Sequence, residues 1–150
     1  MSLVRLAYVS ASLVTDDSNG RRDIADILLS SRRNNDGSEV TGALLATDHN
    51  FSQVIEGERA AVEATYERIA RDPRHKDIML ILYESIEVRR FPDWAMAYIG
   101  PSQTAEEAVA RLTSKVPACK SGQAARALVT LMSQMLTEPS PAEAIVPAAE

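Results

Sequence analysis

The chain has 150 residues, of which 45% are hydrophobic and 25% are charged, and its formal net charge is −5 at pH 7. This composition fits one soluble globular domain with a sizeable core, and the negative charge argues against nucleic acid or an anionic membrane as the main partner. The single cysteine, Cys119, excludes an internal disulfide, and no apolar run reaches the length of a signal segment or a spanning helix, so we expect a cytoplasmic protein.

The first elements are a strand and a helix. Leu3 to Ser10 alternates as a strand does, which puts Tyr8 on the same face as the aliphatic residues Val4 and Leu6. From Arg21 the period changes to that of a helix, with a stripe made of Ile24, Ile27, Leu28 and Ser31. The polar run Asn34 to Gly37 predicts the end of this helix.

A hairpin is expected next, from Val40 to Thr47 and from Phe51 to Ile55, with Asp48 to Asn50 as its turn. In the second of these strands, alternation places Gln53 on the apolar face with Phe51 and Ile55. A buried amide that lacks partners costs roughly 1–3 kcal/mol. Gln53 therefore requires a polar neighbour in the core.

The second half of the folded region repeats the pattern. A helix is expected from Glu58 to Arg71, ending before Asp72-Pro73 because a residue that precedes proline avoids the helical conformation. The unbroken apolar run Ile78 to Tyr83 predicts a central strand that is covered on both faces. A last strand is expected at Trp94 to Ile99, where Trp94, Met96 and Tyr98 alternate with smaller residues and Ile99.

This order of elements predicts an α+β fold, a ferredoxin-like βαββαβ sandwich with an added fifth strand. In that fold the first and third strands are neighbours, so Tyr8 and Gln53 would meet. Residues 1–100 form the expected α+β domain. Residues 101–137 form a helical cap or output segment, with helices at Ala105 to Lys115 and Gln123 to Leu136 that cover the other sheet face or pair with another chain. A loop with Pro117, Cys119, Ser121 and Gly122 joins these helices, and residues 138–150 form a disordered tail.

Five short segments resemble one known family when they are taken in order. They are Arg5 to Ser10, Asn34-Asn35 with Val40-Thr41-Gly42, Phe51 to Gly57, Asp72 to His75, and Arg90 to Met96. Over about residues 3 to 100 they resemble the BLUF domain, a blue-light sensor that uses FAD, in its short single-domain form. The chain departs from the usual pattern at Ala46, where a tyrosine is common, and at Ser38 to Val40.

The resemblance implies that FAD binds noncovalently, with its isoalloxazine between the two helices and beside Tyr8 and Gln53. Ile27 and Ile69 would flank the ring. Asn35 would hydrogen-bond its carbonyl and N3 edge, and Asn34 would lie near the ribityl or phosphate portion. The residues expected at the pyrimidine edge, or behind it as support, are Arg68, Asp72, Arg74 and His75. Trp94 and Met96 match a pair that exchanges positions near Gln53 in such domains.

These residue types suit light sensing. A tyrosine can release an electron and then a proton, and the glutamine amide has a donor end and an acceptor end. When that amide rotates or tautomerises, a different flavin atom receives its hydrogen bond. We therefore expect a photoreceptor without catalytic turnover that signals through a partner protein. Exposed apolar stripes on the last two helices would in addition favour a homodimer or a larger ring.

Other interpretations remain for each residue and for the whole chain. Taken singly, Tyr8 is a core tyrosine, Gln53 a structural amide, and Asn34-Asn35 a helix stop. The alternative function is a ferredoxin-like module that binds a ligand or flavin without photoactivity. An RNA-binding module lacks its aromatic motifs here, and a flavin reductase would need a nicotinamide site, for which no G-x-G-x-x-G is present. The two histidines and one cysteine give no metal-ligand spacing.

Overall fold

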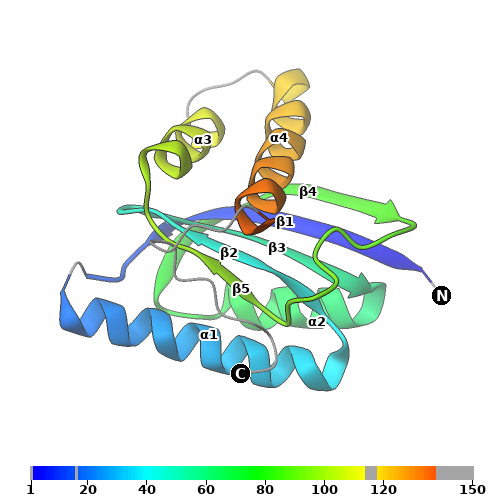
Figure 1. The fold of residues 1–150 in the computed structure, drawn as a ribbon, viewed down its shortest axis with the longest axis horizontal. Coiled ribbons are helices and arrows are strands. Elements are labelled where there is room, and N and C mark those ends of the chain that lie inside the picture. The colour runs from blue at the N-terminus through cyan, green and yellow to red at the C-terminus, as the bar shows by residue number, and fades with distance from the viewer. Residues whose placement is uncertain (1, 16, 114–117, 138–150) are drawn as a thin grey trace.

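The computed structural model describes residues 2–15, 17–113 and 118–137. A sheet with the strand order β4-β1-β3-β2-β5 separates two layers of helices (Figure 1). Its strands are β1 (Leu3–Ser12), β2 (Thr41–Ala46), β3 (Asn50–Glu58), β4 (His75–Ile86) and β5 (Ala97–Ile99). The helices are α1 (Ser18–Ser38), α2 (Arg59–Ala70), α3 (Gln103–Thr113) and α4 (Ala118–Thr137).

The expected ferredoxin-like arrangement is confirmed. Strand β1 lies between β3 and β4 and is antiparallel to both, and its register sets Tyr8 directly opposite Gln53. Helices α1 and α2 cover one face of the sheet, whereas α3 and α4 cover the other (Figure 1). The two side chains that the sequence predicts as neighbours therefore sit on adjacent central strands.

Each sheet face has its own core. On the α1 and α2 face, Tyr8 is buried with Leu6, Leu44, Phe51, Ile55 and Met96. On the opposite face, Val9, Val54 and Ile99 pack with Leu128 and Met132 of α4. The apolar stripe of α4 thus covers the sheet, as one of the two expectations for these helices proposed.

Helix α1 is longer than the sequence indicates. It continues through Asn34, Asn35 and Gly37 to Ser38, and Glu39 ends it with a left-handed φ of 58° while donating its N–H to the Asn35 carbonyl. The expected stop was wrong because the Asn35 side chain does not bend back on its own turn. Its Nδ2 instead donates to the carbonyl of Ala95, a distant partner that local sequence does not reveal.

Strand β4 is an edge strand, so the expectation of a central, doubly covered strand was wrong. Within the described residues it pairs only with β1, and Met79, Leu80 and Tyr83 are 44%, 46% and 38% exposed. Its register with β1 shifts twice, as at β-bulges. Bulges are a common protection of edge strands, and hydrophobicity alone does not distinguish an edge strand from a central one.

Strand β5 lies at the other edge, parallel to β2, and begins only at Ala97. Because Trp94 to Met96 are irregular, the predicted alternation fails there: Met96 joins the core under α1 and α2, and Trp94 packs against the opposite core. Helix α4 begins at Ala118, so Cys119, Ser121 and Gly122 lie in a helix and not in a loop. Pro117 and the expected tail at 138–150 lie outside the described residues.

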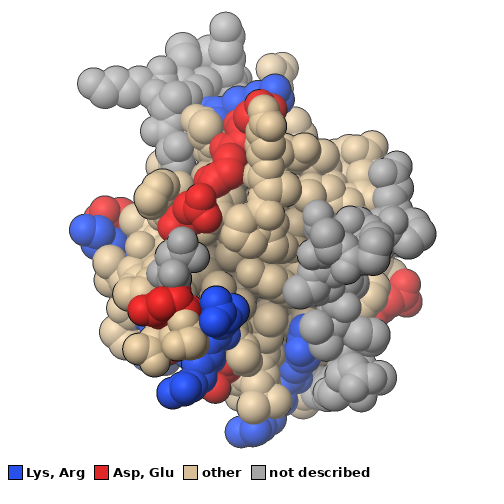
Figure 2. All heavy atoms as spheres, turned by 60° about the vertical axis from the view of Figure 1, so that its left-hand side comes forward, with Lys and Arg blue, Asp and Glu red and all other residues tan. Residues whose placement is uncertain are grey.

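The surface carries charges of both signs. On the face in Figure 2, acidic and basic side chains both occur and the basic ones stand in separate groups. The described residues on this face therefore form no extended basic area of the kind that binds phosphate backbones. In the described part of the chain, no helix combines the length with the apolarity that a membrane span requires. The same described residues contain no group of three or more His, Cys, Asp or Glu side chains that could bind a metal ion.

Candidate cofactor-binding site

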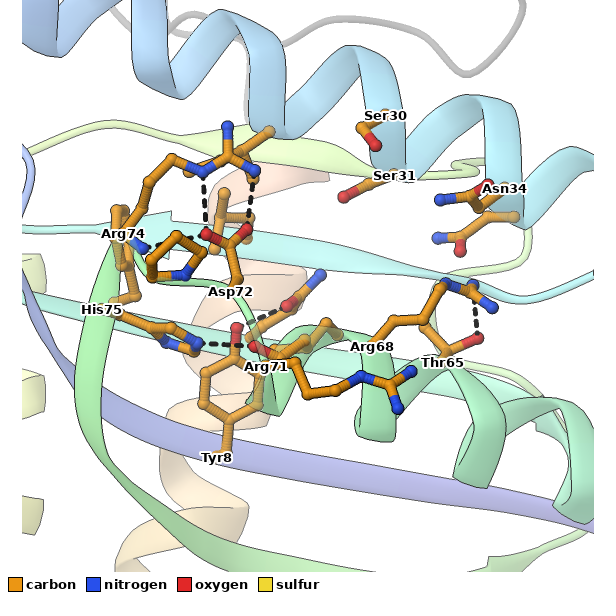
Figure 3. A pocket seen from close by; sticks show the side chains of 17 residues that line it. Tyr8, Ser30, Ser31, Asn34, Thr65, Arg68, Arg71, Asp72, Arg74 and His75 are labelled. Atoms are coloured by element: carbon orange, nitrogen blue, oxygen red, sulfur yellow. Dashed lines mark hydrogen bonds and ion pairs between the residues drawn. The ribbon is translucent and has the colours of Figure 1, made fainter.

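A cavity of about 550 Å³ lies between α1 and α2 above the sheet (Figure 3). Ligand pockets commonly have volumes of this size. The structure brings together, in its lining, the residues that the sequence singled out for cofactor binding: Tyr8, Ile27, Asn34, Asn35, Gln53, Arg68, Ile69, Asp72, Arg74 and His75. Residues far apart in the sequence thus converge on one cavity.

Tyr8 and Gln53 form the floor of the cavity. Each is only 3% exposed, and the Tyr8 hydroxyl donates a hydrogen bond of 2.6 Å to Gln53 Oε1. At its other end, Gln53 Nε2 donates to the sulfur of Met96 at 3.2 Å. Both ends of the amide are therefore occupied, which meets the requirement for a polar partner that burial imposes on it.

The Tyr8 phenol is held in its neutral form. Burial raises its pKa far above the ordinary value of 10.0, and the negative charge of Asp72 adds to the shift. The rings of Tyr66 and His75 have their centroids 6.2 and 5.9 Å from that of Tyr8 and enclose it further. At neutral pH the hydroxyl therefore keeps its proton and remains a hydrogen-bond donor.

Asn35 has one buried polar atom without a hydrogen-bond partner in the described structure. Its Nδ2 donates to the Ala95 carbonyl at 2.6 Å, but its Oδ1 has no hydrogen-bond partner in the described structure although the residue is 1% exposed. An unpaired buried acceptor costs roughly 1–3 kcal/mol, so a ligand that brings an N–H group to this point would remove the penalty. The imide edge of a flavin carries such an N–H, so this atom fits that group.

The side walls of the cavity are aliphatic. Ile27 comes from α1 and Ile69 from α2, and both are partly buried at the edge of the core that contains Tyr8. Facing helices thus supply apolar walls above a polar floor. Such a slot suits a flat aromatic ring whose hydrogen-bonding edge points toward Asn35 and Gln53.

Asp72 and Arg74 form a closed pair at one end of the cavity (Figure 3). Arg74 Nη2 lies 2.6 Å from Asp72 Oδ2, and Arg74 Nε lies 2.9 Å from Asp72 Oδ1. Burial raises the pKa of Asp72, but the hydrogen bonds and charge of Arg74 outweigh it and bring the pKa below its usual value. Because the two side chains satisfy each other's charge and hydrogen bonds, we interpret them as a structural part of the cavity wall.

His75 is held through both ring nitrogens. Its Nε2 lies 2.7 Å from the Ile69 carbonyl, and its Nδ1 lies 2.7 Å from the Ser10 hydroxyl. A carbonyl only accepts, so Nε2 carries a proton and donates to Ile69, while Nδ1 and the Ser10 hydroxyl share the second hydrogen bond. His75 therefore ties β1 to the end of α2 and supports Tyr8 from behind.

Sequence reasoning missed part of the lining, namely Ser30, Ser31, Leu44, Phe51, Thr65, Arg71 and Pro73. A signal existed for two of them: Ser30 and Ser31 follow Ile27 by three and four residues and precede Asn34, so all four share one helix face. Figure 3 shows Ser30, Ser31 and Asn34 on α1 across the cavity from Arg68 on α2. Trp94 and Met96 do not line the cavity; Met96 contacts it only through Gln53.

The sequence matches known proteins over the same region. The model of the BLUF family, described as sensors of blue-light using FAD, matches residues 3–97. Photoactivated adenylate cyclase subunit beta of Euglena gracilis is 31% identical over 96 residues, which cover 63% of this chain and 11% of that protein. The blue light- and temperature-regulated antirepressor BluF of Escherichia coli (strain K12) is 36% identical over 70 residues, 47% of this chain and 17% of that one. The chain thus spans only about a tenth of the cyclase subunit's length.

Solved structures agree with the sequence matches. The BLUF protein BlrB in its dark state superposes with a TM-score of 0.73 at 32% identity, covering 90% of this chain and 98% of that chain. BlsA in its photo-activated state gives 0.73 at 26% identity, with 87% and 94% covered. The family match extends over more than half of the chain, so the chain belongs to the BLUF family and is a sensor of blue light that uses FAD.

Proposed function

We propose that Tyr8 and Gln53 are the photoactive pair of this sensor, and that light changes the hydrogen bonds of the Gln53 amide. The observation that carries the proposal is the 2.6 Å bond between these two buried side chains on the floor of the cavity. FAD supplies the absorption of blue light. The chain supplies an electron and proton donor, Tyr8, and an amide that records the event, Gln53.

The cofactor is held by residues of both helices. Ile27 and Ile69 flank the ring, and the unpaired Asn35 Oδ1 accepts from the ring N–H. The polar lining residues Ser30, Ser31, Asn34 and Arg71 would hold the ribityl and phosphate portion. Arg68, which the resemblance assigns to the pyrimidine edge, lies across the cavity from Ser31 and Asn34 and could also contact that portion (Figure 3). Arginine side chains there favour a phosphate electrostatically. The pair Asp72 and Arg74, together with His75, keeps the wall rigid behind the ring.

Gln53 can adopt two distinct hydrogen-bonded states because the two ends of its amide have different neighbours. Its oxygen accepts from the Tyr8 hydroxyl, and its nitrogen donates to the Met96 sulfur. A half turn of the amide presents the nitrogen to Tyr8 and the oxygen to a sulfur that donates nothing. Both orientations keep a bond to Tyr8, but they differ at Met96 and at the cofactor, so the amide has two distinct states.

Substitution of the pair tests this proposal. We expect Tyr8→Phe and Gln53→Leu each to bind FAD and to lose the reversible red shift of the flavin band under blue light. The matched control is Tyr66→Phe, because the Tyr66 ring also lies beside Tyr8 but has no bond to Gln53. This control should keep the shift. A normal photocycle in either Tyr8→Phe or Gln53→Leu would refute the assignment.

We further infer that the chain is a cytoplasmic sensor module without catalysis of its own, in which residues 1–100 sense light and residues 101–137 transmit the signal to a partner protein. The names of the relatives support a separate output, since one is a cyclase subunit and another an antirepressor that each match over a small part of their length. We also propose that the chain forms a homo-oligomer. The apolar stripe of α4 is buried on the sheet and is not available for this contact, whereas the apolar side chains Met79, Leu80 and Tyr83 of β4 are exposed and support it.

A further inference from the structure

The segment Arg90–Met96, between β4 and β5, is tied to its surroundings along its length by polar groups. At its end, the carbonyl of Trp94 accepts from the Gly42 N–H at 3.0 Å, that of Ala95 from Asn35 Nδ2, and that of Met96 from Arg32 Nε at 3.0 Å. At its start, the N–H groups of Arg90 and Phe91 both donate to one side chain, Glu56.

Glu56 is a fully buried carboxylate with no exposed surface. Its Oε1 accepts from the N–H groups of Arg90 and Phe91 at 2.9 and 2.8 Å, and its Oε2 lies 2.7 Å from Arg5 Nε. A buried charge is tolerated when it is paired and fully hydrogen-bonded, as here. Its removal would leave backbone donors without an acceptor, so this carboxylate determines where the segment begins.

Glu56 and Gln53 belong to the same strand but serve opposite faces. They lie three residues apart on β3, and alternation places Gln53 over the cavity and the Glu56 carboxylate on the side of α3 and α4. The segment Arg90–Met96 is bound by Glu56 at its first residues. Its last residue, Met96, accepts a hydrogen bond from Gln53 Nε2 through its sulfur. One strand therefore holds both ends of the segment.

The same network reaches α4. The Arg90 side chain donates to Thr130 Oγ1 at 3.3 Å. Arg5, which pairs with Glu56, also lies 3.1 Å from Glu84, and Glu84 lies 3.4 Å from Arg126 of α4. Two short chains of polar contacts thus join the Glu56 carboxylate to the helix that covers the face opposite the cavity.

We propose that Glu56 is a positioning residue of the light response: it fixes the segment Arg90–Met96 so that Met96 stays against Gln53, and it links that segment to α4. The proposal rests on the proposed function of Gln53. A merely structural Glu56 would affect unfolding alone. A positioning Glu56 also sets how fast the light-induced state of Gln53 relaxes, because Met96 restrains the amide.

The first test compares two glutamates that both contact Arg5. In Glu56→Gln the side chain keeps its shape but loses the charge and one acceptor, so the segment loosens. Dark recovery of the flavin band should become roughly tenfold faster, the factor expected when a restraint loses about one hydrogen bond. The control Glu84→Gln removes the same charge from a residue that holds Arg5 and Arg126 but no part of the segment. It should recover at the wild-type rate, and equal rates in all three proteins would overturn the proposal.

The second test asks whether Glu56 acts through Met96. In a Met96→Leu background the contact with Gln53 Nε2 is gone, so adding Glu56→Gln should change the recovery rate no further. Fully additive effects of the two substitutions would contradict the proposal, because independent sites add and coupled ones do not.

A third readout needs no substitution and decides the matter if Glu56→Gln fails to fold. In the wild-type chain, the amides of Arg90 and Phe91 should exchange hydrogen more slowly than that of exposed Val88, and illumination should change their rates. The proposal would be overturned if the amides of Arg90 and Phe91 exchange as fast as that of Val88, or if illumination leaves their exchange rates unchanged. If the wild-type protein shows no reversible shift of the flavin band, the proposed function fails. If wild type and Glu56→Gln both show the shift and recover at the same rate, only the proposed role of Glu56 is refuted.

Discussion

Asn35 divides its amide between the protein and the cavity. Its nitrogen holds the Ala95 carbonyl of the segment that ends at Met96, while its oxygen is buried without a partner. A ligand that donates a hydrogen bond to this oxygen is favoured, because it removes the penalty of an unpaired buried acceptor. The same residue also ties the segment to α1, so it connects cofactor binding to the position of Met96.

Asn35→Ala should therefore weaken FAD binding. The loss of one buried hydrogen bond corresponds to an affinity that is lower by roughly 10- to 100-fold. The control is Arg33→Ala, because Arg33 is an exposed residue of the same helix that is not part of the cavity lining, and it should leave the affinity unchanged. Titration of the cofactor-free protein with FAD, followed by flavin fluorescence, measures both. Equal affinities of wild type and Asn35→Ala would show that this oxygen does not meet the cofactor.

At the scale of single residues, the sequence predicted those contacts that local alternation determines. Tyr8 and Gln53 each alternate within regular strands, and the order of elements implies that these strands are neighbours, so their contact could be predicted. Trp94 could not be placed in this way. It precedes β5 in an irregular stretch, where side chains have no fixed period, and it packs on the face opposite Met96.

At the scale of elements, the close approach of β2 to β3 depends on Gly42. A Cβ built there would lie 2.0 Å from the Val54 carbonyl oxygen, which belongs to the paired strand. The strands would have to separate to admit any side chain. Gly42 lies opposite Ile55, two residues from Gln53 on β3, so the close pairing of the two strands beside Gln53 depends on the absence of a side chain at position 42.

Gly42→Ala should lower the free energy of unfolding by roughly 1–3 kcal/mol, as overpacking usually does. The control is Gly37→Ala in α1, where a Cβ meets nothing within 4 Å. That substitution should raise stability by roughly 0.5–1 kcal/mol, because alanine loses less entropy in a helix than glycine. Urea unfolding followed by circular dichroism measures both changes. A Gly42→Ala protein as stable as wild type would mean that the hairpin relaxes without cost.

The existence and type of most elements, and the pairing of β1 with β3, could be predicted, whereas the end of α1 and the edge position of β4 could not. Helix α1 passes through Asn34 and Asn35 because the Asn35 side chain finds its partner in Ala95, which is 60 residues away. The apolar run of β4 gives no sign that the strand lies at an edge. Both features depend on tertiary contacts, which override local preference.

At the scale of the whole molecule, the sheet separates the cofactor from the helices proposed to carry the signal. The cavity lies between α1 and α2 on one face of the sheet, and α3 and α4 lie on the other face (Figure 1). A signal that starts at Gln53 must therefore cross the sheet or pass around its β5 edge. The segment Arg90–Met96 runs between the two faces, with Met96 in one core and Phe91 in the other, which makes it the structural connection that the account requires.

The absorption spectrum of the FAD-loaded wild-type protein, recorded before, during and after blue illumination, tests the central claim most directly. We expect an oxidised flavin band that moves to longer wavelength in the light, keeps its shape and returns in the dark, because only the hydrogen bonds around the cofactor change. A band that stays in place, or one that bleaches without a shift, would contradict the claim that Tyr8 and Gln53 respond to light as a hydrogen-bonded pair.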